Sequence, residues 1–248
     1  MSTYHSKKAK EFLKDPKKVE RHDRTFWSLR QKRDAAAAEL PEWEDLREHA
    51  SRIKEHTATH LADYLEQFSN SLERNGVIVH FAKDAQEFNE MVYGILESHK
   101  VKKLVKSKSM LTEECEMNPY LIKRGINVVE SDLGERILQL MHLKPAHIVM
   151  PAIHLTRDEI GEMFEEKGIS KEKGNHDPTY LTRCAREDLR GDFMDADAGL
   201  TGCNFGVAAT GMKVMPTCQL QYLNYILLPW VLRKLFLIMI RWQCSNAY

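Results

Sequence analysis

Two stretches of the sequence decide the fold, KLVKSKSM at residues 103–110 and INVVESDLGE at residues 126–135. Each contains a short apolar run of Val, Leu or Ile, typical of a buried strand, and each then turns polar at a serine among charged residues. We expect strands at 103–107 and 126–129. A helical pattern near 112–124 separates them, so the strands are expected to run parallel with the helix as the crossover.

The same alternation extends outward from this pair. Further strands are expected at 77–81 and 146–150, and further helices near 84–98, 132–141 and 156–167. Asp132 and Thr156 each precede a Glu by three residues, a spacing that caps the free amide groups of a helix start. The sequence therefore predicts an α/β fold with a mainly parallel sheet.

The N-terminal region departs from this pattern. Residues 1–40 are dense in charged side chains and are predicted to form a solvated helical arm. From Pro41 to Leu72 apolar residues recur at three- and four-residue spacing, which predicts one long amphipathic helix that Gly76 closes. We predict three parts: arm and long helix at 1–74, an incomplete α/β domain at 75–218, and an aberrant apolar tail at 219–248.

The amino-acid composition of the chain disfavours several classes of function. The chain carries 36 basic and 36 acidic residues, so it lacks the positive field that drives binding to nucleic acid. No secretory signal is recognised in its first residues, and a cytoplasmic location is expected. Its five cysteines are scattered without a C-x-x-C pair, which favours free thiols over a metal site.

The first site candidates follow the strand at 103–107. Open parallel sheets bind ligands beyond the carboxyl ends of their strands. Lys106, Ser107 and Lys108 lie at such an end, and their ammonium and hydroxyl groups are suited to holding a carboxylate or phosphate. A plain solvated loop accounts for them equally well.

Further candidates follow the next strands. A cluster of three carboxylates follows the strand at 126–129, at Glu130, Asp132 and Glu135. Such a cluster is suited to binding a hydroxyl or to acting as a base, although helix capping explains part of it. His154 follows the strand at 146–150, where histidine is suited to proton transfer. Catalytic candidates are therefore Glu130, Glu135 and His154, and Asp132 is a ligand-binding candidate.

Residues 195–211 contain four glycines among small side chains. Backbone of this kind can approach a ligand closely, which makes Thr201 and Asn204 binding candidates. The spacing differs from the G-x-G-x-x-G pattern of dinucleotide sites. The alternative is a tight crossing between strands, where glycine avoids steric conflict and Asn204 ties down backbone amides.

Several segments together resemble the lactate-utilisation (LUD) domain family in order and spacing: KSKSM at 106–110, ESDLGE at 130–135, PAHI at 145–148, PAIH at 151–154 and ADAGLTGCNF at 196–205. The resemblance covers roughly residues 5–212. Within that family, the chain is most similar to the branch in which a helical arm precedes the domain and a ferredoxin-like region follows it.

The resemblance implies a three-layer α/β fold similar to the sugar-phosphate isomerase and CoA-transferase (NagB/RpiA-like) superfamily. It also implies a role in oxidising L-lactate, a small carboxylate, to pyruvate beside two other lactate-utilisation subunits. Electrons would pass through two 4Fe-4S clusters, whose cysteines lie downstream in that family. Each cluster takes four thiolates from tight cysteine runs, so no cofactor is expected in this chain by itself.

The resemblance ends after Gly211. Residues 219–248 contain no Asp or Glu and are strongly apolar. A shifted reading frame is the leading interpretation, and a membrane anchor is the alternative. Polar residues interrupt the apolar run, whereas a span needs about 20 predominantly apolar residues, so no membrane span is predicted.

The predicted function is an electron-transfer subunit of a lactate-oxidising iron–sulfur complex, truncated before its clusters and inactive alone. The alternatives are a stand-alone enzyme of the isomerase or CoA-transferase type, acting on a small carboxylate or phosphate, and an inactive remnant. The stand-alone enzyme would need activity without iron, sulfide or a partner.

Overall fold

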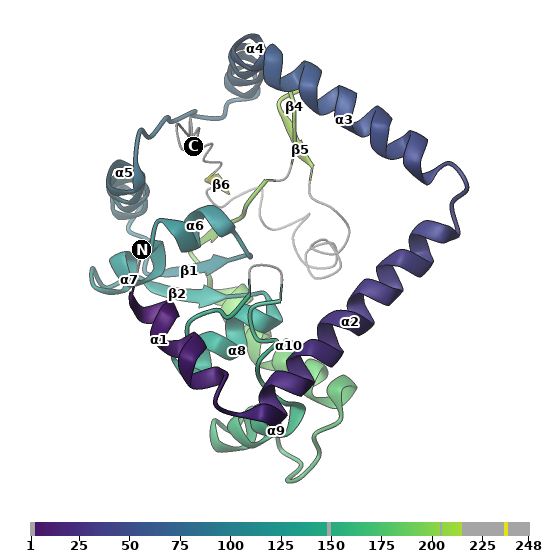
Figure 1. The fold of residues 1–248 in the computed structure, drawn as a ribbon. Helices are drawn as coiled ribbons and strands as arrows, with labels where there is room; N and C mark the ends of the chain where they lie inside the picture. The colour runs from purple at the N-terminus through teal and green to yellow at the C-terminus, as the bar shows by residue number, and fades with distance from the viewer. Residues whose placement is uncertain (1–2, 148–149, 204, 215–235, 238–248) are drawn as a thin grey trace. The chain divides into compact units, whose positions relative to one another are not determined.

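The computed structural model describes residues 3–147, 150–203, 205–214 and 236–237. The chain divides into two compact units, Met1–Tyr64 and Leu65–Tyr248. The first unit is helical and the second holds the sheets (Figure 1). The predicted division into 1–74, 75–218 and 219–248 stays a prediction, and most of the predicted tail lies outside the described residues.

The first unit consists of α1 (Thr3–Phe12), α2 (Pro16–Ala38), α3 (Trp43–Thr59) and the first turn of α4 (Leu61–Arg74). Asp15 caps α2, because its carboxylate accepts hydrogen bonds from the backbone N–H groups of Lys17 and Lys18. Neither α2 nor α3 buries a described residue. Helix α2 therefore matches the solvated arm expected at residues 1–40, whereas α3 lies in the segment predicted as a long amphipathic helix.

The prediction of one continuous helix from Pro41 to Leu72 is wrong, because α3 ends at Thr59 and α4 begins at Leu61. His60 adopts φ −108° and ψ 27° between them. Thr59 donates its hydroxyl to the Glu55 carbonyl oxygen, and Nδ1 of the His60 ring lies 2.9 Å from the backbone carbonyl oxygen of His56. Side chains that engage carbonyl groups of the preceding turn compete with the helical ladder and bend it.

The second unit contains the α/β core. Its remaining helices are α5 (Ala85–Ser98), α6 (Met110–Glu114), α7 (Met117–Ile122), α8 (Leu133–Met141), α9 (Arg157–Glu166) and α10 (Pro178–Asp195). Its strands are β1 (Lys103–Lys106), β2 (Asn127–Glu130), β3 (Ala198–Leu200), β4 (Phe205–Val207), β5 (Met212–Val214) and β6 (Phe236–Leu237).

The main sheet has the strand order β2-β1-β3-β6, and each neighbouring pair is parallel. In this register Lys106 lies opposite Glu130 on one side and opposite Leu200 on the other. The strands predicted at 103–107 and 126–129 are confirmed within one residue at their ends. Strand β3, which the sequence analysis did not predict, lies within the glycine-rich segment at 195–211 and places Thr201 directly after the sheet.

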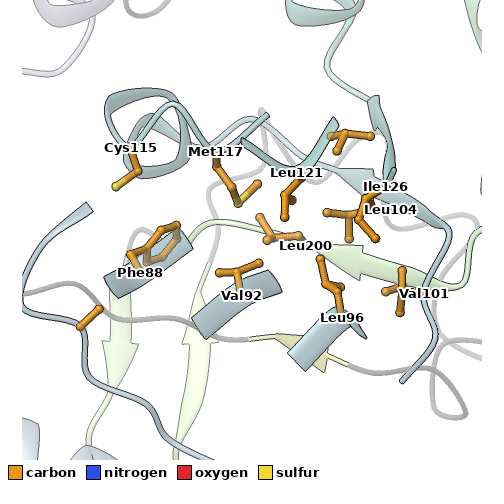
Figure 2. Close-up of a cluster of buried hydrophobic side chains, with 13 residues drawn as sticks. Phe88, Val92, Leu96, Val101, Leu104, Cys115, Met117, Leu121, Ile126 and Leu200 are labelled. Carbon is orange, nitrogen blue, oxygen red and sulfur yellow. The ribbon is translucent and has the colours of Figure 1, made fainter. Parts of the chain in front are cut away.

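Helices cover both faces of this sheet (Figure 1). One face, which carries Leu104 and Val128, packs against α5 and α7 in a single apolar cluster (Figure 2). The other face packs Val105 and Val129 against Leu189 of α10, and α8, α9 and α10 share a further cluster. The predicted fold class, a three-layer α/β arrangement around a mainly parallel sheet, is confirmed.

Three predicted elements are corrected. Residues 77–80 form no strand, and Phe81 makes only an isolated bridge. Ile78 is 75% exposed, so this segment runs over the surface instead of entering the core. The helix predicted at 112–124 is split into α6 and α7, because Glu116 adopts a left-handed φ of 49°.

The strand predicted at 146–150 is not present among the described residues. Ala146, His147 and Met150 are in bends, and residues 148–149 lie outside the described part. The Ala146 N–H donates to the Pro151 carbonyl oxygen at 3.1 Å. Such a bond closes a tight loop within the segment, which is incompatible with an extended strand.

Strands β4 and β5 form an antiparallel hairpin that packs on α4. Ser71 donates its hydroxyl to the Ala208 carbonyl oxygen at 2.8 Å. Gly211 has φ +71°, and a Cβ there would lie 2.9 Å from the backbone N of Leu72. A Cβ at Gly206 would likewise meet the Phe68 ring at 2.9 Å. Close packing therefore explains these two glycines without a ligand.

Candidate functional site

The candidate site lies at the carboxyl edge of the main sheet. Strands β1, β2 and β3 end there in parallel, at Lys106, Glu130 and Leu200. The Ser107 N–H donates to the Leu200 carbonyl oxygen, and the Ser131 N–H and hydroxyl both donate to the Lys106 carbonyl oxygen, each at 2.9 Å. These bonds hold the three strand ends together, so the residues that follow them share one edge.

Lys106 is the centre of a buried ion-pair group. Its side chain has no exposed surface, and its ammonium lies 2.8 Å from Oε1 of Glu130 and 3.1 Å from Oε1 of Glu113. The ammonium also donates to the Thr112 hydroxyl at 3.1 Å. An ammonium has three N–H donors, and these three partners use all of them.

The pKa of Lys106 is raised above its ordinary value. Burial alone lowers it, because desolvation disfavours the charged form, but the two nearby carboxylates outweigh that effect. A raised pKa means that the folded chain stabilises the ammonium form up to high pH. The lysine is therefore a fixed positive charge under all ordinary conditions.

Glu130 is buried to the same depth, with 2% of its surface exposed. Its Oε1 accepts hydrogen bonds from Lys106 and from the side-chain amide of Asn118. Its Oε2 accepts no hydrogen bond within the described part of the chain, and neither does Oδ1 of Asn118. Burial raises the pKa of the Glu130 carboxyl, and the Lys106 ammonium opposes this rise.

Glu135 adds a third carboxyl group from the first turn of α8. Asp132 caps this helix, since its carboxylate accepts the Glu135 N–H at 3.2 Å. Glu135 is 6% exposed. Burial raises the pKa of its carboxyl to about 7, and the negative charges of Glu113 and Glu130 add to the rise. A carboxyl with this pKa can accept and return a proton at neutral pH.

Helix α8 is fixed by polar contacts on two sides. Gln139 donates to the Val128 carbonyl oxygen at 2.7 Å and accepts the Glu130 N–H at 3.2 Å, which ties α8 along β2. Arg136 pairs with Asp188 of α10 at 3.2 Å. Glu135, which directly precedes Arg136 on this helix, is therefore held on a rigid element.

The other predicted residues take different places. Lys108 is partly exposed, and its carbonyl oxygen would lie 3.4 Å from a Cβ at Gly202, so the loops after β1 and β3 touch. The Thr201 hydroxyl donates to the Gly202 carbonyl oxygen at 3.1 Å. His154 lies in a turn before α9. Asn204 lies outside the described residues.

Sequence reasoning missed three members of the group, Thr112, Glu113 and Asn118. They come from α6 and α7, which follow β1 and pack over the same face of the sheet as Lys106. No motif marks them. Their placement depends on the break at Glu116, which turns the chain between the two short helices.

The described residues offer no fit for a metal or an iron–sulfur cluster. No group of three or more His, Cys, Asp or Glu side chains suited to a metal occurs in the described part of the chain. Cys115 and Cys184 belong to separate apolar clusters, and Cys203 is exposed. A 4Fe-4S cluster needs four thiolates around one small centre, which these three cysteines do not supply.

A family model described as the LUD domain matches residues 65–222, more than half of the chain. The chain belongs to the LUD domain family. The match contains the whole group of Lys106, Glu113, Glu130 and Glu135, so the ion-pair group is part of the LUD domain itself. The family resemblance expected from the sequence motifs is confirmed.

Three relatives of this LUD domain chain carry the name "Lactate utilization protein B". The protein from Exiguobacterium sp. is 45% identical over 183 residues, which are 74% of this chain and 38% of that protein. The proteins from Oceanobacillus iheyensis and Bacillus pumilus are 46% and 47% identical over 190 residues, 76% of this chain and 39% and 40% of theirs. This chain thus spans about two fifths of these relatives.

No solved structure matches the chain. Within the described residues, no helix combines the length and the apolar character needed to cross a membrane.

Proposed function

We propose that this chain is the LUD-domain part of a lactate-utilisation protein and that it contributes to the oxidation of L-lactate to pyruvate. The observation that carries the proposal is its 45–47% identity to proteins named Lactate utilization protein B. The LUD match over residues 65–222 supports it, because it includes the strand-end group around Lys106.

The residues of the group suit the chemistry of a 2-hydroxycarboxylate. Oxidising such a molecule to a 2-oxocarboxylate removes two electrons and two protons. A fixed cation holds the substrate carboxylate, and Lys106 is such a cation. A carboxylate base accepts the hydroxyl proton, and the raised pKa values of the Glu130 and Glu135 carboxyls, about 7 for Glu135, suit this role.

In this proposal the two electrons and the proton of the Cα–H bond would pass to an acceptor in a larger assembly with two further lactate-utilisation subunits, where two 4Fe-4S clusters would supply the electron-transfer chemistry. The cysteines in the described part of the chain do not fit a cluster, so no step is assigned to them. The described part of this chain then provides the substrate end of the reaction: it binds the carboxylate and takes up the hydroxyl proton.

The proposal predicts that the purified full chain binds L-lactate saturably at pH 7, with a dissociation constant in the millimolar range or below. Isothermal titration calorimetry measures this directly. Lactamide, which keeps the hydroxyl but replaces the carboxylate with an uncharged amide, is the matched control and should give no saturable heat. The absence of L-lactate binding up to about 50 mM, far above ordinary substrate affinities, would contradict the proposal.

A further inference from the structure

The partners of Lys106 differ sharply in exposure. Glu130 and Thr112 are buried, with 2% of each residue's surface exposed, whereas the Glu113 side chain is 26% exposed. Glu113 also comes from α6, a helix of only five residues. Of the three groups that hold the ammonium, Glu113 is therefore the one that can move toward solvent without opening the core.

The ammonium has no donor left for a ligand while Glu113 is in place. Any carboxylate that binds Lys106 must replace one of the three partners. Glu113 is itself a carboxylate on the most exposed side of the lysine, so it occupies the position that an incoming carboxylate would take. Its charge also leaves the group of Lys106, Glu113 and Glu130 with one excess negative charge, which opposes anion binding.

A second observation concerns two acceptor atoms of the group, Oε2 of Glu130 and Oδ1 of Asn118. Lys106 and Asn118 both donate to Oε1 of Glu130, while Oε2 remains buried without a donor among the described residues. Oδ1 of Asn118 is also buried without a donor among the described residues, because the amide group of Asn118 turns its nitrogen toward the Glu130 carboxylate. A buried acceptor without a hydrogen-bond donor costs free energy, so binding a ligand that brings a donor to these atoms would be favourable.

We propose that Lys106 and Glu130 form a two-point seat for a small 2-hydroxycarboxylate, and that Glu113 is an internal competitor that closes the seat when it is empty. The ligand carboxylate replaces Glu113 on the Lys106 ammonium, and the ligand hydroxyl donates to Oε2 of Glu130. This inference rests on the proposed function and specifies its substrate contacts and its gate.

The test compares the L-lactate affinities of the full chain and two variants by calorimetry at pH 7. Glu113→Gln keeps the size of the side chain and removes its charge, so L-lactate should bind roughly fivefold more tightly. Glu114→Gln is the matched control, since Glu114 is the next residue of α6 and is exposed; its affinity should equal that of the unaltered chain. Thermal unfolding of both variants verifies that they are folded.

A ligand series tests the hydroxyl contact without altering the protein. Propionate has the carboxylate of L-lactate but no hydroxyl, and it should bind at least about tenfold more weakly, because Oε2 of Glu130 then stays without a donor. Equal binding of the two ligands, or an unchanged affinity in Glu113→Gln, overturns the inference and leaves the proposed function standing. If no small carboxylate binds any form of the chain, both fall.

Discussion

Replacing Lys106 with methionine is expected to lower the free energy of unfolding by about 3–5 kcal/mol at pH 7, because the change leaves Glu130 buried without its counter-ion. Methionine fills much of the same volume, so loss of charge pairing is the main effect. The raised pKa of Lys106 gives the pH range: its stabilising contribution is complete at low and neutral pH and is lost only as pH rises through that raised pKa. Chemical denaturation measures the difference.

Two further variants separate the charge effect from packing. Lys102→Met replaces an exposed lysine just before β1 and should change stability by less than about 0.5 kcal/mol. Adding Glu130→Gln to Lys106→Met should recover part of the loss, since the uncompensated charge is then removed. A cost below about 1 kcal/mol for Lys106→Met alone would mean that the pair is solvated and that the buried group does not exist as described.

Replacing Glu135 with glutamine is expected to stabilise the folded chain above pH 7, by on the order of 2 kcal/mol. The folded-state pKa of about 7 lies above the ordinary value of 4.5 for a glutamate carboxyl. The folded state therefore binds more protons than the unfolded state between these values, and the unaltered chain loses stability as pH rises from 4.5 to 7. Glutamine carries no charge, so the variant escapes this loss.

The pH dependence of the Glu135→Gln effect is the decisive feature. Denaturation at pH 5 and pH 8 should give a small difference from the unaltered chain at pH 5 and the full gain at pH 8. Glu162→Gln, at an exposed position on α9, is the matched control and should show no such pH-dependent gain. A gain of equal size at both values would show that Glu135 ionises like an ordinary carboxyl group.

Local patterns predicted the layers of the fold well. The apolar runs at 103–107 and 126–129 predicted β1 and β2, and the capping pair of Thr156 and Glu159 predicted the start of α9, where both reciprocal bonds are present. These elements follow from residues that are close in sequence. The exposed Ile78 shows the limit, since a strand-like composition does not supply a partner strand.

The location of the candidate site could be predicted from the sequence, but only some of the residues that form it could. Lys106 and Glu130 were identified because they end parallel strands, and register alone places them side by side. Glu113 and Asn118 depend on how α6 and α7 fold over the sheet, which no local pattern specifies. The raised pKa of Glu135 likewise depends on burial and on charges from other elements.

Residue-resolved NMR titration of the full, isotope-labelled chain with L-lactate shows where the substrate binds, because amide shifts locate a bound ligand as well as detect it. We expect saturable shifts concentrated at the carboxyl edge of the main sheet, at residues 106–109, 113–118, 130–135 and 201–202. Saturable shifts elsewhere, with these four segments unmoved, would contradict the assignment of this edge as the substrate site.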